Sequence, residues 1–208
     1  MPSRNVVKTD VADSFFHVYA GGTSRSEIFI EDQDYQTFLR LFARYLSKEP
    51  QRDRVGVPYP HLYDKLELVC FCLAINHFHL LLYQIEEGAM ARLMRSIMVS
   101  YSRYFNKKYH RTGSLFETRY KASLISDPNY FEHITRYIHL NRKDWESSPY
   151  SSIDFYLGRQ KAEWVRPERI LAMFAGPEDY MKFVSDYEAN KQIFDELKYE
   201  LANYTTTQ

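Results

Sequence analysis

Two histidines separated by a single residue, His77 and His79, are the side chains of this sequence best suited to bind a metal ion. Alternate side chains of a β-strand share a face, so both imidazoles would point to one side and Phe78 to the other. Neutral imidazoles are common ligands of divalent metals, and the pair therefore predicts half of a metal site. The pattern also occurs as two polar residues on the solvated face of a strand, so further residues must distinguish these interpretations.

A tyrosine and an asparagine supply a second set of candidate groups. Tyr137 and Asn141 are four residues apart in a segment with helical spacing, and residues at this separation lie on one face of a helix, about 6 Å apart. Brought against two imidazoles, they would provide one phenol nucleophile and a third neutral metal ligand. The same spacing also fits a helix in which Tyr137 and Leu140 pack inward and Asn141 ends the helix.

Other tyrosines and histidines are weaker candidates. Tyr101 and Tyr104 are five and two residues from Asn106, so neither shares a helical face with that amide, and Tyr101 belongs to an apolar stripe. His133 precedes Tyr137 by one helical turn and could tune the phenol or contact a phosphate, or be a plain surface residue. Neither Tyr101 nor Tyr104 is therefore placed beside an amide as Tyr137 is, and both are weaker candidates for a nucleophile.

The charge of the chain is unevenly distributed. Its net charge is zero, but residues 91–143 contain 11 basic and 3 acidic side chains, whereas the segment from Lys161 onward contains six basic and nine acidic ones. Aromatic side chains alternate with the bases of the middle segment. Single-stranded nucleic acid requires cations for its phosphates and flat side chains for its unpaired bases, so this composition favours such a partner. Ordinary solvated helix faces are the alternative.

The composition is that of a folded protein without membrane segments. The chain has 208 residues, 45% of them hydrophobic, and no apolar run has the length of a membrane span. Residues 1–10 lack the apolar core of a secretory signal. Cys70 and Cys72 are spaced unfavourably for a disulfide, so we expect a reduced, cytoplasmic protein.

The hydrophobic pattern predicts strands and helices in the order β-α-β-β-α-β-α. The expected segments are a strand over 14–20, a helix from Asp32, two strands within 65–85 that turn near Asn76, a helix over 90–105, a strand within 115–125 and a helix from 127 or 129 to 141. This order predicts an α+β fold with an antiparallel sheet and helices packed over one face. We expect residues 1–158 to form this domain and 159–208 to form an acidic helical extension.

Four segments of the chain, in this order, resemble those of the HUH single-tyrosine transposases, and most closely their REP-associated tyrosine transposase branch. They are residues 76–82 with the two histidines, 115–121, 136–141 with the tyrosine and asparagine, and 148–158. The resemblance implies a ferredoxin-like or RRM-like HUH domain. Three positions depart from the family pattern: Ile75 and Arg142 replace common prolines, and Gly21 replaces a common arginine whose loss could weaken a DNA contact.

The resemblance implies cleavage and transfer of one DNA strand. Tyr137 would attack a phosphodiester and become joined to the 5′-phosphate, and His77, His79 and Asn141 would hold a divalent metal, Mg²⁺ or Mn²⁺. The implied partner is single-stranded or hairpin-forming repeat DNA, bound by a monomer or homodimer with no part for a membrane. The basic residues expected to contact DNA are Arg103, Lys107, Lys108, Arg111, Arg119, Lys121, Arg136 and Arg142.

Two alternatives stay open. A protein of the same fold could bind folded single strands without cutting them, although the intact set of site residues argues against a loss of chemistry. An unrelated metal-dependent hydrolase would need carboxylates near the two histidines, and Glu86 and Glu87 are the nearest in sequence.

Overall fold

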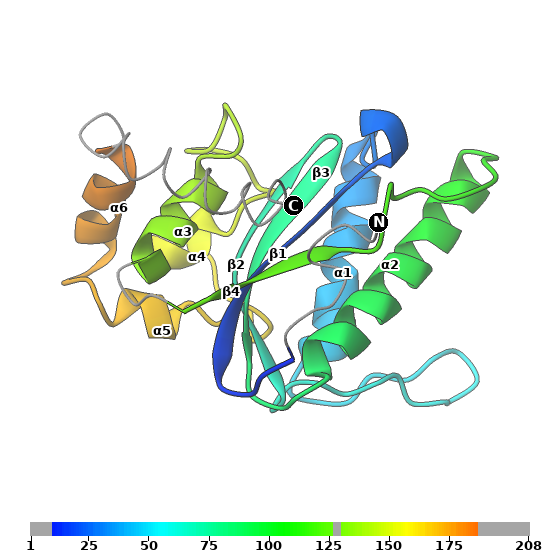
Figure 1. Cartoon of the computed structure of the whole chain (residues 1–208), viewed down its shortest axis with the longest axis horizontal. Coiled ribbons are helices and arrows are strands. Elements are labelled where there is room, and N and C mark those ends of the chain that lie inside the picture. The colour runs from blue at the N-terminus through cyan, green and yellow to red at the C-terminus, as the bar shows by residue number, and fades with distance from the viewer. Residues whose placement is uncertain (1–9, 127–129, 187–208) are drawn as a thin grey trace, which may run out of the picture.

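The computed structural model describes residues 10–126 and 130–186. Its elements, in chain order, are β1 (Ser14–Gly21), the 3₁₀ turn η1 (Thr23–Arg25), α1 (Asp32–Leu46), β2 (Leu66–Ala74), β3 (His77–Gln84), α2 (Ala89–Lys108), β4 (Lys121–Ile125), α3 (Phe131–His139), α4 (Ile153–Tyr156), α5 (Glu168–Leu171) and α6 (Pro177–Ser185). The four strands form one antiparallel sheet in the order β2-β3-β1-β4 (Figure 1). The predicted order of strands and helices is confirmed as far as α3.

The hairpin of β2 and β3 arises from a long apolar run that one turn interrupts. Residues 75–76 form this turn and His77 is the first residue of β3, as the sequence predicts. Because β3 lies between β2 and β1, His79 is opposite Cys72 on one side and Tyr19 on the other. Because β3 is hydrogen-bonded along both edges, the sheet fixes the positions of both histidines.

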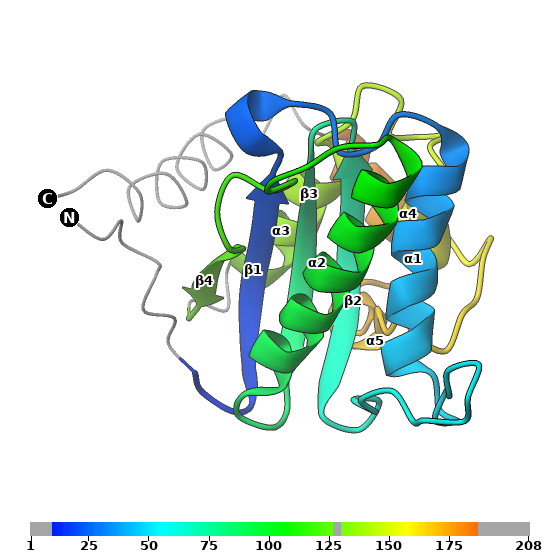
Figure 2. The same ribbon diagram turned by 90° about the vertical axis from the view of Figure 1, so that its right-hand side faces the viewer.

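Helices cover both faces of this sheet. The α1 and α2 helices pack on the face that carries Phe78 and Leu80, whereas α3 lies against β2 and β3 on the opposite face (Figure 1, Figure 2). The α+β class with an antiparallel sheet is confirmed, but the expectation of helices over a single face is corrected. The reason is that both faces carry buried apolar side chains, such as Leu82 on one and Val69 and Leu81 on the other.

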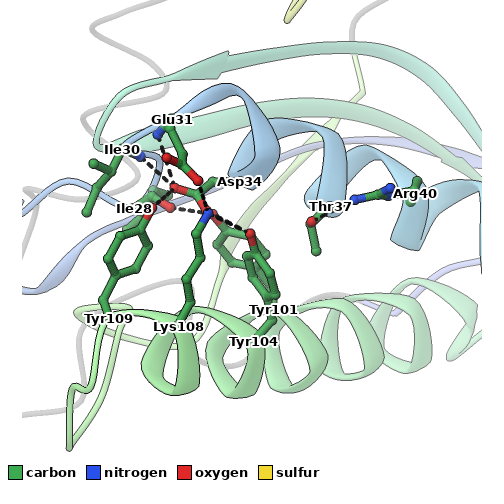
Figure 3. A network of polar contacts seen from close by, with 10 residues as sticks. All are labelled: Ile28, Ile30, Glu31, Asp34, Thr37, Arg40, Tyr101, Tyr104, Lys108 and Tyr109. Atoms are coloured by element: carbon green, nitrogen blue, oxygen red, sulfur yellow. Dashed lines mark hydrogen bonds and ion pairs between the residues drawn. The ribbon is translucent and has the colours of Figure 1, made fainter.

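A buried carboxylate, that of Asp34, braces the layer formed by α1 and α2 (Figure 3). It accepts hydrogen bonds from two backbone N–H groups just before α1 and from three side chains at the end of α2, namely Ile30, Glu31, Tyr104, Lys108 and Tyr109. Burial alone would raise the pKa of Asp34, but the bonds from Lys108 and the other donors outweigh it and hold this pKa below its usual value. The network therefore ties together two segments that are 70 or more residues apart in the chain.

The chain after Gly158 packs back onto the sheet domain. The α5 helix contacts β2 and α6 contacts α3, while Trp164 and Val165 pack against the core on the α1 and α2 side. The described part of the predicted extension is thus short helices and loops in contact with the sheet. The division into two units at residue 158 stays a prediction. Within the described residues, no helix combines the length and the apolar character needed to cross a membrane.

Candidate active site

Ring side chains of two neighbouring strands gather on the face of the sheet that α3 covers. His17 and Tyr19 alternate along β1 as His77 and His79 do along β3, and the strand register places Tyr19 directly opposite His79. The rings of His17 and His79 stack with 5.1 Å between their centroids, and the Tyr19 ring lies 5.7 Å from His79. Strand pairing therefore builds a cluster of four rings, two from each strand.

The α3 helix places Tyr137 against this cluster. Ile134 and Ile138 of α3 are fully buried, and the helix contacts β2 and β3. With that side of the helix fixed, the ring of Tyr137 meets the ring of His79 edge-on at 5.5 Å and that of His17 at 5.8 Å. The tyrosine and the histidines predicted from the sequence thus lie together within one chain.

Asn141 lies in the turn after α3 and contacts the other histidine of the pair. Its Oδ1 atom is 2.7 Å from His77 Nε2, and His77 Nδ1 is 2.7 Å from Asn76 Oδ1. A neutral imidazole has one ring N–H. When Nδ1–H donates to Asn76, His77 Nε2 and Asn141 Oδ1 are two acceptors that face each other. A cation bound by both satisfies this arrangement.

The second histidine of the pair contacts a third imidazole. His79 Nδ1 is 2.9 Å from His17 Nε2. Burial lowers the pKa of His17 to about 3. Burial, and then the neighbouring His17 and His77, lower the pKa of His79 well below 6.5. Both buried rings are therefore neutral at physiological pH, and the neutral form is the one that binds metals.

The contacts point to a metal-ligand set of two imidazoles and one amide oxygen. Within residues 10–126 and 130–186, no group of three or more His, Cys, Asp or Glu side chains is arranged to hold a metal. A set of His77, His79 and Asn141 would add no negative charge, so a bound divalent ion would keep its full attraction for a phosphate. Imidazole ligands favour Mn²⁺ over Mg²⁺.

The phenol of Tyr137 is protonated in this environment. Burial, and then the nearby Tyr19, raise the pKa of Tyr137 above its usual value of 10. The ring of Tyr19 also contacts Lys121, whose Nζ lies 5.7 Å from the ring centroid. One of the predicted DNA-contacting cations is therefore next to the ring cluster.

Arg136, which the sequence predicts to contact DNA, is buried in the structure. Its side chain is 0% exposed, and its guanidinium donates to the Phe183 carbonyl oxygen at 3.1 Å and bonds His133 Nδ1 at 2.7 Å. The prediction is corrected because Arg136 faces α6 instead of solvent. His133, by the same contact, has a structural partner.

Two further basic residues have protein partners. Lys108 bonds the buried carboxylate of Asp34 at 2.7 Å. Arg142 bonds Asp144 through Nε and Nη2 and donates from Nη1 to the Leu73 carbonyl oxygen at 2.9 Å. Their contact with DNA stays a prediction, but both side chains are already held by the fold.

The remaining predicted DNA contacts lie at the surface. The side chains of Arg103, Lys107 and Arg119 are exposed, and those of Arg111 and Lys121 are half-buried. Exposed bases can approach a phosphate without losing a protein partner that the fold requires. These five residues are therefore the better candidates for the predicted surface.

The other candidate nucleophiles and acids lie in structural contacts away from the rings. The Tyr101 hydroxyl donates to the Ile28 carbonyl oxygen, and the Tyr104 hydroxyl donates to Asp34, on the opposite side of the sheet (Figure 3). β3 has 8 residues and begins at His77, and Glu86 follows its other end. At about 3.3 Å per residue, roughly 25 Å separates Glu86 from His77. Glu86 thus lies at the opposite end of β3 from the two histidines.

Sequence reasoning missed two residues of the cluster, His17 and Asn76. The alternation of His17 with Tyr19 on β1 repeats that of the two histidines on β3 and was a usable signal. Its meaning depends on the register of β1 against β3, which a local pattern does not contain. The sequence indicates that Asn76 is a turn residue, but the contact of its side chain with His77 depends on the geometry of the turn.

Residues 62–141 match the family model described as Transposase IS200 like, and this segment contains His77, His79, Tyr137 and Asn141. No curated protein matches the chain.

Two solved structures are similar to this chain. The first is a REP-associated tyrosine transposase bound to a REP hairpin, with 12% sequence identity, a TM-score of 0.50, and coverage of 76% of this chain and 88% of that chain. The second is a putative transposase from Deinococcus radiodurans R1, with 14% identity, a TM-score of 0.39, and coverage of 68% and 98%. At 12% identity the first match shows a shared fold. The comparisons confirm the resemblance seen in the sequence. Residues 62–141 match the IS200-like transposase family model, and the chain shares the fold of a REP-associated tyrosine transposase.

Proposed function

We propose that this protein cleaves and transfers single DNA strands through Tyr137, acting on hairpin-forming repeats as a transposase does. One observation carries the proposal: Tyr137 lies against His79 while Asn141 bonds His77, so the end of one helix meets both histidines of one strand. The family match over the same residues supports it. All four side chains come from a single chain, which supports a complete site in each chain, whether the protein acts as a monomer or a homodimer.

The chemistry follows from the phenol. Tyr137 Oη attacks the phosphorus, the new Oη–P bond forms and the bond from phosphorus to the 3′-oxygen breaks. The phenol loses its proton and the departing 3′-oxygen gains one, so no water or nucleotide is consumed. The aryl phosphodiester retains the energy of the broken bond, and a second 3′-hydroxyl can attack it to rejoin a strand.

The residues present fit a divalent metal. His77 Nε2 and Asn141 Oδ1 face each other, Asn76 holds the other ring nitrogen of His77, and His79 is neutral. When bound, Mg²⁺ or Mn²⁺ would neutralise charge that develops on the phosphate. The protein itself orients the phenol by packing α3 on the sheet.

The DNA strand needs contacts on either side of the attacked phosphate. Lys121 and Tyr19 lie beside the ring cluster and offer a cation and an aromatic face. The exposed bases Arg103, Lys107 and Arg119 offer further phosphate contacts. The REP hairpin in the similar solved structure supports a hairpin as the bound form.

The deciding experiment is a covalent adduct assay with a single-stranded hairpin oligonucleotide labelled at its 3′ end and Mn²⁺. Wild-type protein should carry the label through denaturing electrophoresis, because the tyrosine keeps the strand that begins with the 5′-phosphate. The Tyr137→Phe variant should bind the oligonucleotide but carry no label. Tyr104→Phe is the matched control and should form the adduct.

The assay also separates the competing function. If wild-type protein binds the hairpin tightly but yields neither adduct nor cut strand with Mn²⁺ or Mg²⁺, it is a binding module. If the Tyr137→Phe variant still forms the adduct, another residue is the nucleophile.

A further inference from the structure

A third histidine lies in the site without being part of the expected ligand set. His17 is 1% exposed and its Nε2 is 2.9 Å from His79 Nδ1, with the two rings only 8° from parallel. This bond uses Nδ1 of His79 and leaves Nε2 as the ring nitrogen with no hydrogen bond inside the described residues. His79 Nε2 is thus the atom available to a metal.

The proton positions in this pair decide whether His79 can bind. A neutral imidazole has one N–H and one lone pair, on different nitrogens. If His17 donates, the proton of His79 is on Nε2 and this nitrogen has no lone pair for a metal. If His79 donates from Nδ1, its Nε2 lone pair is free, and His17 must then carry its own proton on Nδ1.

A serine lies where that last proton would need an acceptor. Ser123 of β4 is directly opposite His17 in the sheet, and directly opposed residues of antiparallel strands present their side chains on the same face, about 5 Å apart at Cβ. Ser123 Oγ and His17 Nδ1 are both buried, and neither has a hydrogen-bond partner among the residues described. Two neighbouring unsatisfied polar atoms are costly, and a rotation of Ser123 or one bridging water would satisfy both.

We propose that Ser123, His17 and His79 form a hydrogen-bonded relay that holds His79 in the tautomer whose Nε2 lone pair faces the site. His17 is a positioning residue, because it acts on the metal only through His79. Metal-binding histidines generally donate their second N–H to a protein acceptor, and removing that acceptor typically weakens metal binding 10- to 100-fold. The inference rests on the proposed function, since it needs the metal site of His77, His79 and Asn141.

The test is Mn²⁺ affinity of the full chain, measured by electron paramagnetic resonance without DNA. His17→Leu should weaken binding by about 10- to 100-fold, and His17→Gln should restore part of the loss because its amide oxygen can accept the bond. Ser123→Ala should weaken binding by a smaller factor. Ser151→Ala is the matched control, since Ser151 is also a buried serine with no partner for its Oγ but pairs with Cys72 on the other side of β3.

A measurement on the unmutated protein covers the case in which His17→Leu fails to fold. In ¹⁵N spectra of the metal-free protein, the chemical shifts should show His79 protonated at Nδ1 and unprotonated at Nε2, because the relay sets this tautomer before a metal binds. The opposite tautomer would overturn the relay, as would a folded His17→Leu variant that binds Mn²⁺ like the wild type. If the wild type binds no Mn²⁺, the metal site of the proposed function fails and the relay fails with it.

Discussion

Each histidine of the site contacts a neighbouring side chain through Nδ1, and His77 also contacts Asn141 through Nε2. His77 uses Nδ1 for Asn76, and His79 uses Nδ1 for His17. His77 Nε2 faces Asn141, and the ring of His79 lies against that of Tyr137. Second contacts of this kind fix the orientation of a ring before any ion binds, so they reduce the entropy lost on binding.

Asn141 provides the most direct prediction at this scale. Asn141→Ala removes the oxygen that faces His77 Nε2, and we expect Mn²⁺ affinity to fall by about 10-fold or more, and adduct formation with it. Asn141→Asp keeps an oxygen in place and adds a negative charge, so metal should bind at least as tightly. Adduct formation by this variant should nevertheless be slower, because the carboxylate weakens the pull of the ion on the phosphate.

Metal binding by electron paramagnetic resonance and adduct rates measured on the same preparations check this pair. Equal Mn²⁺ affinity of Asn141→Ala and wild-type protein would remove Asn141 from the ligand set. Equal adduct rates of the aspartate variant and wild type would show that ligand charge does not matter.

At the scale of elements, the position of Tyr137 depends on how α3 is held. The Tyr180 hydroxyl of α6 bonds His139 Nδ1 at 2.8 Å and Thr135 Oγ1 at 3.0 Å, and all three side chains are buried. Arg136 also stacks on the ring of Phe183, 4.3 Å from its centroid. The helix that carries the candidate nucleophile is thus fixed by the sheet on one side and by α6 on the other.

Removing the Tyr180 hydroxyl should loosen this arrangement. Tyr180→Phe leaves His139 Nδ1 without its partner in a buried site, while Thr135 keeps its bond to the Glu132 carbonyl oxygen. We expect a loss of about 1–3 kcal/mol in the free energy of unfolding. Tyr83→Phe is the matched control, because the Tyr83 hydroxyl bonds Asp13 in an exposed position, and it should change stability by less than about 0.5 kcal/mol. Urea denaturation measures both, and a control that is destabilised as much as Tyr180→Phe would contradict the assigned role.

The same helix shows where sequence reasoning stops. The helical spacing of apolar residues predicts α3. It also predicts that Tyr137 and Asn141, one turn later, lie on the same face of the helix. Arg136 was predicted to be a phosphate contact because a charged residue on a helix is usually solvated. Its burial depends on α6, which is 40 or more residues later in the chain, and a local pattern contains no information on such packing.

Strand register explains the other difference. The β2–β3 hairpin was predicted correctly because its turn is local, and His77 and His79 were therefore placed well. The approach of His17 requires β1 to pair with β3 across more than 60 residues, in one particular register. Non-local pairing is the part of a fold that sequence periodicity does not determine.

In the molecule as a whole, the two faces of the sheet have different roles. The face covered by α3 carries the candidate site, whereas the face covered by α1 and α2 carries the larger apolar core and the Asp34 network (Figure 2, Figure 3). The basic residues of the middle segment serve both, since Lys108 holds the network while Lys121 lies by the rings. A segment rich in bases is therefore divided between structure and the predicted DNA surface.

The Asp34 network makes a prediction about acid stability. The pKa of Asp34 is lower in the folded protein than in the unfolded chain, because hydrogen bonds from Lys108 and the other donors outweigh burial. A carboxylate with a depressed pKa contributes stability above its unfolded value of about 4 and loses that contribution as the pH falls through its folded value. We expect Asp34→Asn to cost about 1–3 kcal/mol in unfolding free energy at pH 7, because the buried acceptor loses its charge while Lys108 keeps its ion pair with Glu31. Urea denaturation between pH 7 and pH 3 should also show a shallower loss of stability for this variant than for wild type.

The control is Asp53→Asn, in a surface loop, which should lose stability with pH as steeply as the wild type. If Asp34→Asn and wild type lose stability equally steeply, the Asp34 carboxylate does not govern acid unfolding.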